Sequence, residues 1–204
     1  TLTALSKVNY EGNVTLSTET LPLRFTDVPA GHWAYPYIMQ LADDGYVNGI
    51  GGNMFGTGDD MCRRDFVTIL GRIAGVDVSA YQNQVFADVE TGSYYAPYVA
   101  WAAEKGIVQG YGNDLFGPND AITRSQMAVI IVRYAAFAEI GMPSSTKNAK
   151  YADDAAIEAW AIDAVYTARD AGLITGKTGN LYDPQASATR AEVSTVLCRL
   201  LYRI

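Results

Sequence analysis

The chain has 204 residues, of which 49% are hydrophobic, and carries a formal net charge of −7. This length allows one large domain or two small ones, and the hydrophobic content is sufficient for a globular core. The negative charge argues against a nucleic-acid partner, because such proteins usually present a basic face. No apolar run approaches the roughly 18 residues of a membrane span, so we expect no membrane insertion.

Residues 1–24 are rich in Thr, Ser, Leu and Asn and show no sustained helical period. They contain a short alternating run from Asn13 to Ser17, and alternation is typical of a strand. We therefore predict a leader that forms a linker or a single edge strand. The chain begins at Thr1 with neither a start Met nor a signal-peptide pattern, which indicates a piece of a longer product.

The rest of the sequence is a threefold repeat. Residues 25–74 align without a gap on residues 86–135, and a third copy follows over residues 151–201. Each copy has an aromatic-x-Asp start, a helix that ends at Gly, a Gly-rich turn and a second helix that begins near an Arg. Self-similarity of this kind indicates a repeat architecture. We divide the chain into a leader and three repeats that form one structural domain: unit one (25–80), unit two (81–145) and unit three (146–204).

Both helices of a unit show apolar stripes at helical spacing. The first helix of unit one carries Trp33, Tyr37, Ile38, Leu41 and Ala42, and the first helices should stop at Gly45, Gly106 and Gly172. The second helices repeat the i, i+3, i+4, i+7 pattern of a buried face at Phe66, Ile69, Leu70 and Ile73, at Met127, Ile130, Ile131 and Tyr134, and at Val193, Val196, Leu197 and Leu200. A helix pair of about 50 residues cannot bury two stripes alone, so the units should pack on one another. The predicted fold is all-α, with three helix-loop-helix units closing into an approximately threefold bundle.

Gly-rich turns join the two helices of each unit. They begin at Gly49, Gly110 and Gly176 and end at an aromatic residue. Gly, Asn and Asp in these turns are expected to supply positive φ angles, and the closing aromatic to anchor the turn in the core. A calcium loop is the alternative, but the alternating acidic ligands of such loops are missing.

Two of the three second helices begin with a capping box. Thr123 with Gln126, and Thr189 with Glu192, have the T-x-x-E/Q spacing in which two side chains satisfy backbone N–H groups at a helix start. The equivalent position in unit one is Cys62, which is a poor cap. We expect this helix to begin without a side-chain cap.

An arginine follows the cap position in all three units, at Arg63, Arg124 and Arg190. A cation in the first turn opposes the helix dipole, so helix stability does not explain it. Either an external anion or an internal carboxylate would, since the planar guanidinium binds carboxylates with two hydrogen bonds. Truncating these arginines is therefore expected to change stability little. A second repeated set near the helix C-termini is explained by the dipole alone: Arg72, Arg133 and Arg199.

Other kinds of site have little support in the sequence. Cys62 and Cys198 fit neither a zinc cluster nor a redox pair, and we expect a replaced cap and a small core residue rather than a disulfide. An enzyme, for example a glycan hydrolase with paired carboxylates, is disfavoured, because the one histidine, His32, is replaced by Ser93 in unit two and no nucleophile motif is present.

Taken together, the ordered motifs resemble three tandem S-layer homology repeats. The resemblance is carried by Phe25-Thr26-Asp27-Val28, by Phe86-Ala87-Asp88-Val89, by His32-Trp33-Ala34, by the three helix-ending glycines and by Thr189-Arg190-Ala191-Glu192. The family implies a noncovalent anchor at the bacterial cell wall or S-layer, outside the cell, with a cargo domain on the same longer chain. It implies a pseudo-threefold spindle whose inter-repeat grooves bind secondary cell-wall polysaccharide, an anionic glycan that often bears pyruvate ketals on N-acetylmannosamine. No cofactor or metal is implied, and some members resemble peptidoglycan binders instead.

The resemblance assigns roles by position. The carboxylate clamp falls on Arg63, Arg124 and Arg190, with the backbone N–H groups of the same helix starts assisting. Trp33, Tyr94 and Trp160 are candidates for stacking on sugar faces, although a core role is favoured for them. Asp27, Asp88 and Asp153 either hold loops or accept sugar hydroxyls, with the loop role favoured. The candidate set is completed by the turn residues Gly49, Gly110 and Gly176.

The units depart from the family pattern in different ways. Unit one has Cys62-Arg63-Arg64-Asp65, unit two has Ser125-Gln126 for the usual Ala-Glu, and unit three has Asp153-Asp154 for Asp-Val. The grooves are therefore expected to be unequal, and the degenerate motif around Arg63 to mark an idle one. The remaining alternative is a protein–protein or oligomerisation module, which would show a concentration-dependent size without glycan.

Overall fold

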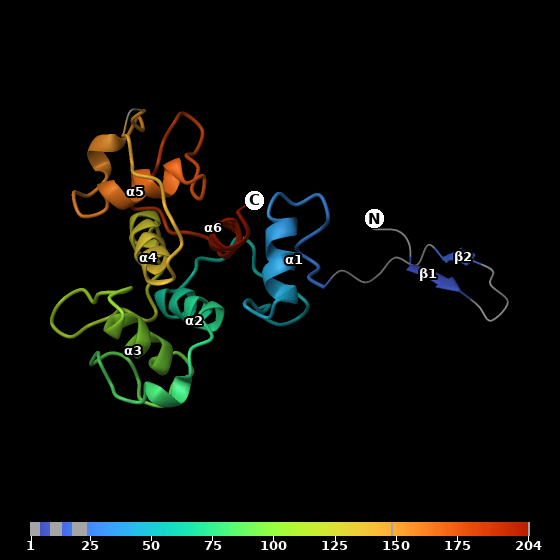
Figure 1. Ribbon diagram of the computed structural model, residues 1–204, viewed down its shortest axis with the longest axis horizontal. Coiled ribbons are helices and arrows are strands. Elements are labelled where there is room, and N and C mark those ends of the chain that lie inside the picture. Colours follow the sequence, from blue (N-terminus) through green and yellow to red (C-terminus); the bar gives the residue numbers. More distant parts are fainter. Residues whose placement is uncertain (1–4, 9–13, 18–23, 148, 204) are drawn as a thin grey trace.

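The computed structural model describes residues 5–8, 14–17, 24–147 and 149–203. Six α-helices form the body of the chain (Figure 1), so the all-α prediction is confirmed. Unit one contains α1 (Tyr35–Asp43) and α2 (Arg63–Ile73), followed by the 3-10 helix η1 (Val78–Ala80). Unit two contains α3 (Ala96–Glu104) and α4 (Arg124–Phe137), and unit three contains η2 (Asp154–Ala156), α5 (Ile162–Asp170) and α6 (Arg190–Tyr202).

The leader contains two short strands instead of the single strand expected. β1 (Leu5–Val8) pairs antiparallel with β2 (Val14–Ser17), with Leu5 opposite Ser17 and Val8 opposite Val14. Of the two alternatives offered for the leader, a linker or a single edge strand, the strand is found at the alternating run, but its partner strand shows no such pattern in the sequence. Leader residues 1–4, 9–13 and 18–23 lie outside the described part of the chain.

The helix boundaries follow the predicted signals. Thr123 and Thr189 each form a full capping box with the residue three positions later, whereas Cys62 makes no side-chain cap. The first helices end just before Gly45, Gly106 and Gly172, whose φ angles of 78°, 68° and 73° suit a residue without a Cβ atom.

Helices pair between units. α2 packs against α3 of unit two, α4 against α5 of unit three, and α6 against α1 of unit one. Figure 1 shows α2, α4 and α6 toward the centre of the body, with α1, α3 and α5 outside them. The second helix of every unit thus covers the first helix of the next, so the three units close into a ring.

A cycle of backbone hydrogen bonds holds the centre of this ring. The N–H of Met61 donates to the carbonyl of Ala188 (2.9 Å), that of Ala188 to Ile122 (2.9 Å), and that of Ile122 back to Met61 (2.8 Å). All three residues are buried. Each stands two residues before a first-turn arginine, so the cycle fixes the three helix starts relative to one another.

The predicted stripes form one core, with three exceptions: Tyr37 and Ile73 are only partly buried, and Trp33 is exposed. The stripe residues of α4 and α6 are all buried, whereas Ile73 of α2 is only partly covered. Trp33 was wrongly placed in the core: it precedes α1, and 57% of its surface is exposed. Both cysteines are free. Cys198 is buried as expected, and desolvation raises the pKa of its thiol to about 11.

Candidate functional site

The first-turn arginines reach into the neighbouring unit. Arg63 of unit one contacts the turn of unit two, Arg124 of unit two contacts that of unit three, and Arg190 of unit three contacts that of unit one. Arg63 and Arg124 are only 3% exposed, and Arg190 is half-buried. Each guanidinium also lies over the ring of the aromatic that closes the turn, at 4.6–5.1 Å from Phe116, Tyr182 or Phe55.

Backbone carbonyls are the main acceptors of these guanidinium groups. Nε of Arg63 donates to the carbonyl of Phe116 (2.9 Å) and Nη2 donates to that of Gln109 (3.3 Å). Arg124 makes the equivalent bonds to Tyr182 and Thr175 (2.8 and 3.0 Å), and Arg190 makes them to Phe55 and Asn48 (2.9 and 2.7 Å). Neither explanation offered by the sequence, an external anion or an internal carboxylate, includes these carbonyls, although Arg124 does also pair with the carboxylate of Glu192 at 3.1 Å. The arginines tie each unit to the turn of the next.

The helix-start N–H groups are also occupied. Those of Arg63, Arg124 and Arg190 each donate, at 2.9 Å, to a carbonyl of the neighbouring unit. The acceptors are Asp120, Ala186 and Asp59. The expectation that these N–H groups help to bind a ligand is therefore wrong.

For Arg63 and Arg124, the third guanidinium nitrogen donates to the side chain that completes the capping box of the next unit, three residues after its cap position. Nη1 of Arg63 donates to Oε1 of Gln126 (3.2 Å), and Nη1 of Arg124 donates to Oε1 of Glu192 (3.1 Å). The equivalent residue in unit one is Asp65, which is one methylene shorter. Its carboxylate instead accepts from the hydroxyl of Tyr94 and lies 3.7 Å from Nε of Arg64. No hydrogen bond from Nη1 of Arg190 is found among the described residues.

Three grooves lie beside these arginines, one for each turn. Each contains a first-turn arginine from one unit, a turn and second helix from the next, and an aromatic residue from the third. We name each groove by its first-turn arginine. The Arg63 groove (about 300 Å³) includes Trp160, the Arg124 groove (about 210 Å³) includes Trp33, and the Arg190 groove (about 240 Å³) includes Tyr94.

The three aromatic residues are exposed, contrary to the core role favoured by the sequence. Exposure is 57% for Trp33, 56% for Tyr94 and 57% for Trp160. They precede the first helices and so lie at the rim of a groove instead of in the helix stripe. His32 stacks on Trp33 with ring centroids 5.5 Å apart, which helps to fix the ring.

A second arginine in every groove was missed by sequence reasoning. Arg72, Arg133 and Arg199 line the Arg190, Arg63 and Arg124 grooves respectively. The dipole gave them a sufficient local explanation, so nothing in the sequence pointed to a groove. Their nine-residue spacing from the first-turn arginines was the available signal: it repeats in all three units.

The turn glycines line the grooves, and glycine is required at these positions for a reason other than a positive φ angle. Gly49, Gly110 and Gly176 all have negative or extended φ. A Cβ atom on Gly49 would lie 2.5 Å from the carbonyl of Met54 and 2.8 Å from the ring of Phe25. Gly110 is as crowded, and Gly176 nearly so. These positions allow the backbone to approach the aromatic that opens the unit.

The three aspartates hold the turns. Asp27 accepts from the N–H groups of Phe55 and Gly56 (2.7 Å each), one with each carboxylate oxygen. Asp88 and Asp153 bind the equivalent pairs. Burial alone would raise the pKa of Asp27, but the turn N–H groups outweigh it and the pKa lies below its usual value, as does that of Asp153. Among the described residues, none of the three lines a groove.

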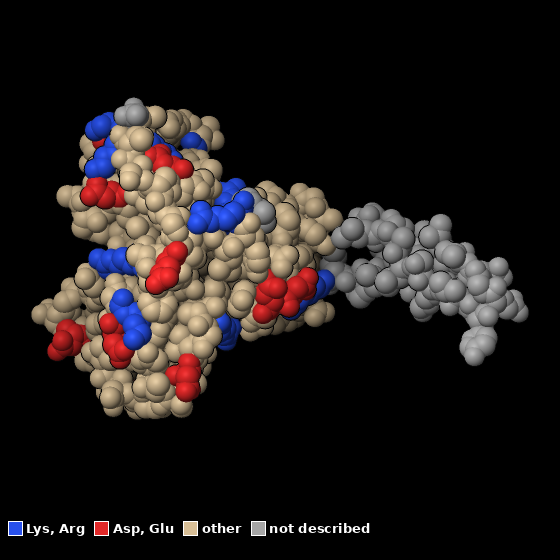
Figure 2. Space-filling view, in the orientation of Figure 1, with Lys and Arg blue, Asp and Glu red and all other residues tan. Residues whose placement is uncertain are grey.

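The grooves differ in their acidic residues. The Arg124 groove contains Glu192, paired with Arg124, and the Arg190 groove contains Asp65. No carboxylate lines the Arg63 groove within the described chain, since its polar neighbours are the amides of Gln109 and Gln126. On the face shown in Figure 2, acidic and basic side chains are interspersed and no basic surface covers the body.

The described residues contain neither a metal cluster nor a membrane-spanning helix. In the part of the chain that the structure describes, no group of three His, Cys, Asp or Glu side chains could hold a metal ion. None of the described helices combines the length and apolar character needed to cross a membrane.

Comparison with known proteins identifies the repeats. The family model described as "S-layer homology domain" matches residues 24–67, 85–128 and 150–194. The chain is 31% identical over 180 residues to an endoglucanase of Bacillus sp. (strain KSM-635), covering 88% of this chain and 19% of that protein. It is 28% identical to an S-layer protein of Bacillus thuringiensis subsp. finitimus and 29% identical to the S-layer protein sap of Bacillus anthracis, covering 86% of this chain and 21% of each relative.

These relatives are all much longer than the chain, which spans about a fifth of their length. The three matched repeats make up the body of this chain, in which every groove is built from all three units. The chain therefore belongs to the S-layer homology domain family, as three tandem copies of the domain, and is a cell-surface anchoring module.

Proposed function

We propose that the grooves bind an anionic polysaccharide of the cell wall, and that this noncovalent binding anchors a longer protein at the cell surface. The observation that carries the proposal is the composition of the grooves. Each brings together two arginines and one exposed aromatic residue, contributed by all three units. Arginine suits carboxylate groups, and a rim aromatic suits the apolar face of a sugar ring.

The buried arginines are suited to this role because their position is fixed before a ligand arrives. Arg63 donates three hydrogen bonds within the protein, and a guanidinium has five N–H donors. Two donors therefore remain, on a side chain that loses little freedom on binding. Preorganisation of this kind lowers the cost of association.

The Arg63 groove is the strongest candidate for anion binding. Arg63 and Arg133 line it without a carboxylate, whereas Arg124 is already paired with Glu192 at 3.1 Å. Asp88 and Asp120 act on Arg63 electrostatically, but neither lines the groove. This proposal reverses the expectation from the degenerate motif of unit one. The residue that decides the charge of the groove is Gln126 of unit two.

Two reciprocal substitutions test this preference without removing an arginine. Gln126→Glu would pair Arg63 with a carboxylate, and Glu192→Gln would release Arg124 from one. Both keep the capping box, which accepts either residue. Affinity for purified wall polysaccharide would be measured by isothermal titration, with retention on sacculi before and after removal of that polysaccharide as a second readout.

We expect Gln126→Glu to weaken binding by about ten- to hundredfold, the equivalent of one charge-assisted hydrogen bond. Glu192→Gln should leave binding unchanged or strengthen it. Equal affinity of both variants and the parent would refute a role for groove charge. Retention on sacculi stripped of the polysaccharide would instead favour peptidoglycan, and a concentration-dependent mass without glycan would favour an oligomerisation module.

A further inference from the structure

The residue that follows each first-turn arginine differs between the three units. It is Arg64 in unit one, Ser125 in unit two and Ala191 in unit three. In units one and two, its side chain contacts the loop before the first helix of the next unit, and this loop carries the exposed aromatic residue of a groove. The two departures from alanine therefore lie at a contact between units.

Ser125 binds a carboxylate of unit three. It is buried in the first turn of α4, and its hydroxyl donates to Oε2 of Glu158 at 2.8 Å. The amide of Gln185, which lies between the Gly-rich turn of unit three and α6, donates to Oε1 of the same carboxylate. Hydrogen bonds to an ionised carboxylate are among the stronger ones in proteins. The side chain of Glu158 is thus fixed on both oxygens, by one donor from unit two and one from unit three.

Glu158 also begins the turn that presents Trp160. The N–H groups of Ala161 and Ile162 donate to the carbonyl of Glu158 at 2.9 and 3.1 Å, so Trp160 lies inside this turn. The ring lines the Arg63 groove and is 57% exposed. Among the described residues, it has neither a stacked aromatic partner nor a hydrogen-bond acceptor for its indole N–H. Its orientation therefore depends on the turn, which is anchored through Glu158.

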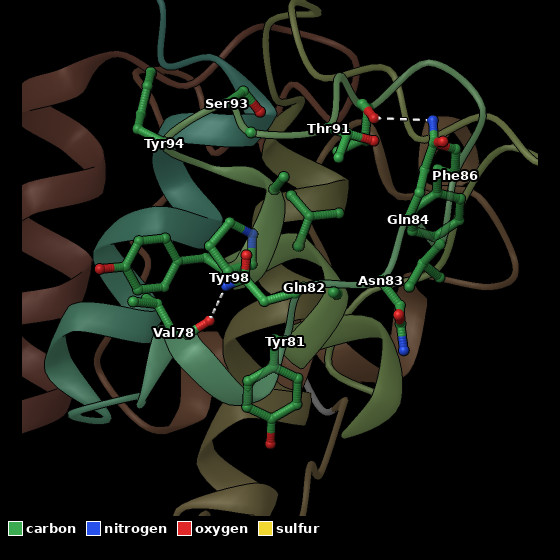
Figure 3. A pocket seen from close by; sticks show the side chains of 17 residues that line it. Val78, Tyr81, Gln82, Asn83, Gln84, Phe86, Thr91, Ser93, Tyr94 and Tyr98 are labelled. Atoms are coloured by element: carbon green, nitrogen blue, oxygen red, sulfur yellow. Dashed lines mark hydrogen bonds between the residues drawn. The ribbon is translucent and has the colours of Figure 1, made fainter.

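The aromatic residue of unit two is held in a different way. The hydroxyl of Tyr94 donates to Asp65 and accepts from Nε of Arg64 (3.2 Å), so the aromatic side chain is itself bound to unit one. Figure 3 shows Tyr94 beside Ser93, on one side of a cavity next to η1 and away from Phe86. Oγ of Ser93 has no partner in the described part of the chain. Tyr94 is thus the polar side chain that fixes this loop.

The aromatic residue of unit one lacks a polar contact of either kind. Ala191 offers no side-chain donor, and Trp33 stacks on His32 instead, with ring centroids 5.5 Å apart. Two residues before the aromatic, where unit three has its carboxylate, units one and two have Gly31 and Gly92. The serine–carboxylate contact therefore belongs to one groove of the three.

We propose that Ser125 and Glu158 are positioning residues for the Arg63 groove, because the hydrogen bond between them holds Trp160 at the rim before a ligand arrives. A side chain that is already ordered loses less conformational freedom on binding. Both departures of the unit-two motif, Ser125 and Gln126, then act on the same groove. The identity of the ligand rests on the proposed function, whereas the orientation of Trp160 can be tested without a ligand.

The test without a ligand compares two buried serines. Ser125→Ala removes the hydroxyl but changes no charge. Ser194→Ala is the control, because this serine of α6 also makes one hydrogen bond of 2.8 Å, to the carbonyl of Arg190, and lines none of the three grooves. The full chain is labelled with fluorotryptophan, and the signals of its three tryptophans are followed by fluorine NMR.

We expect Ser125→Ala to shift or broaden the signal of Trp160 and to leave the other two tryptophan signals in place. Ser194→Ala should leave all three unchanged. If Ser125→Ala does not fold, Glu158→Gln replaces it, since an amide offers an acceptor oxygen to only one of the two donors. A Trp160 signal that is the same in the parent and in the folded variant would overturn the proposal.

Titration with purified wall polysaccharide extends the test to binding. Ser125→Ala should bind about two- to tenfold more weakly than the parent, which corresponds to the cost of ordering one side chain, and Ser194→Ala should bind like the parent. If Ser125 acts through Trp160, adding Ser125→Ala to Trp160→Ala should weaken binding no further. A further loss in the double variant, or equal affinity of Ser125→Ala and the parent, would refute the positioning role. If the parent itself does not bind the polysaccharide, the proposed function fails, and the fluorine signals alone decide whether the contact fixes Trp160.

Discussion

Truncating Arg63 should destabilise the whole body, although its position in a first helical turn suggests little effect. The side chain is 3% exposed and joins unit one to unit two. Arg63→Ala removes hydrogen bonds to the carbonyls of Phe116 and Gln109 and to the amide of Gln126. It also leaves the two carbonyls without this donor in a largely buried position.

The expected loss follows from these contacts. A hydrogen bond to a charged group contributes about 1.5–3 kcal/mol, and removing one partner from a buried charged cluster costs about 3–5 kcal/mol in all. For a domain of this size, about 2–4 °C of melting temperature is lost per kcal/mol. Arg63→Ala should therefore lower the melting temperature by about 6–20 °C.

Calorimetry measures the melting temperature, and urea unfolding measures the free energy of unfolding. Arg133→Ala is the control, because this arginine lines the same groove but makes one longer bond, at 3.3 Å to Gln109. It should change the free energy of unfolding by about 0.5 kcal/mol or less. If the melting temperature of Arg63→Ala lies within about 2 °C of the parent, the hydrogen bonds of Arg63 between units do not stabilise the fold.

Three further outcomes are expected. Thr189→Ala should cost about 0.5–2 kcal/mol in urea unfolding because it removes a formed capping box, whereas Cys62→Thr should be neutral or stabilising; a strongly destabilised Cys62→Thr would contradict this. The pKa values of Asp27 and Asp153 lie below 3.8 in the folded protein, so the unfolded chain takes up protons first, and the stability they contribute should be lost as pH falls below about 4. Urea midpoints across that range test this, and Asp27→Asn should flatten the decline. Trp160→Ala should leave the melting temperature unchanged, since the side chain is 57% exposed, but weaken binding of wall polysaccharide in titrations; unaltered binding would remove the aromatic from the site.

The sequence alone was sufficient to predict the helices of the three units and their order along the chain. Apolar spacing located the first helix of unit one and all three second helices, and the T-x-x-E/Q signal located two helix starts, because these patterns depend on contacts within a few residues. The repeat then located the first helices of units two and three. The glycine that ends each first helix is also a local requirement, since it takes a positive φ angle. The repeat itself predicted that the units share a core.

The tertiary structure decided what the repeated polar residues do. Arg63 and the carbonyl of Phe116 are far apart in the chain, and nothing local distinguishes an arginine aimed at solvent from one aimed at a neighbouring turn. Trp33 shares the spacing of a core stripe, yet the helix begins after it and the ring stays at the surface. The charge of each groove depends on an arginine of one unit and on the residue three positions after the cap position of the next unit. Only the closure of the ring brings those two together, because it depends on packing between units and not on the pattern within any one of them.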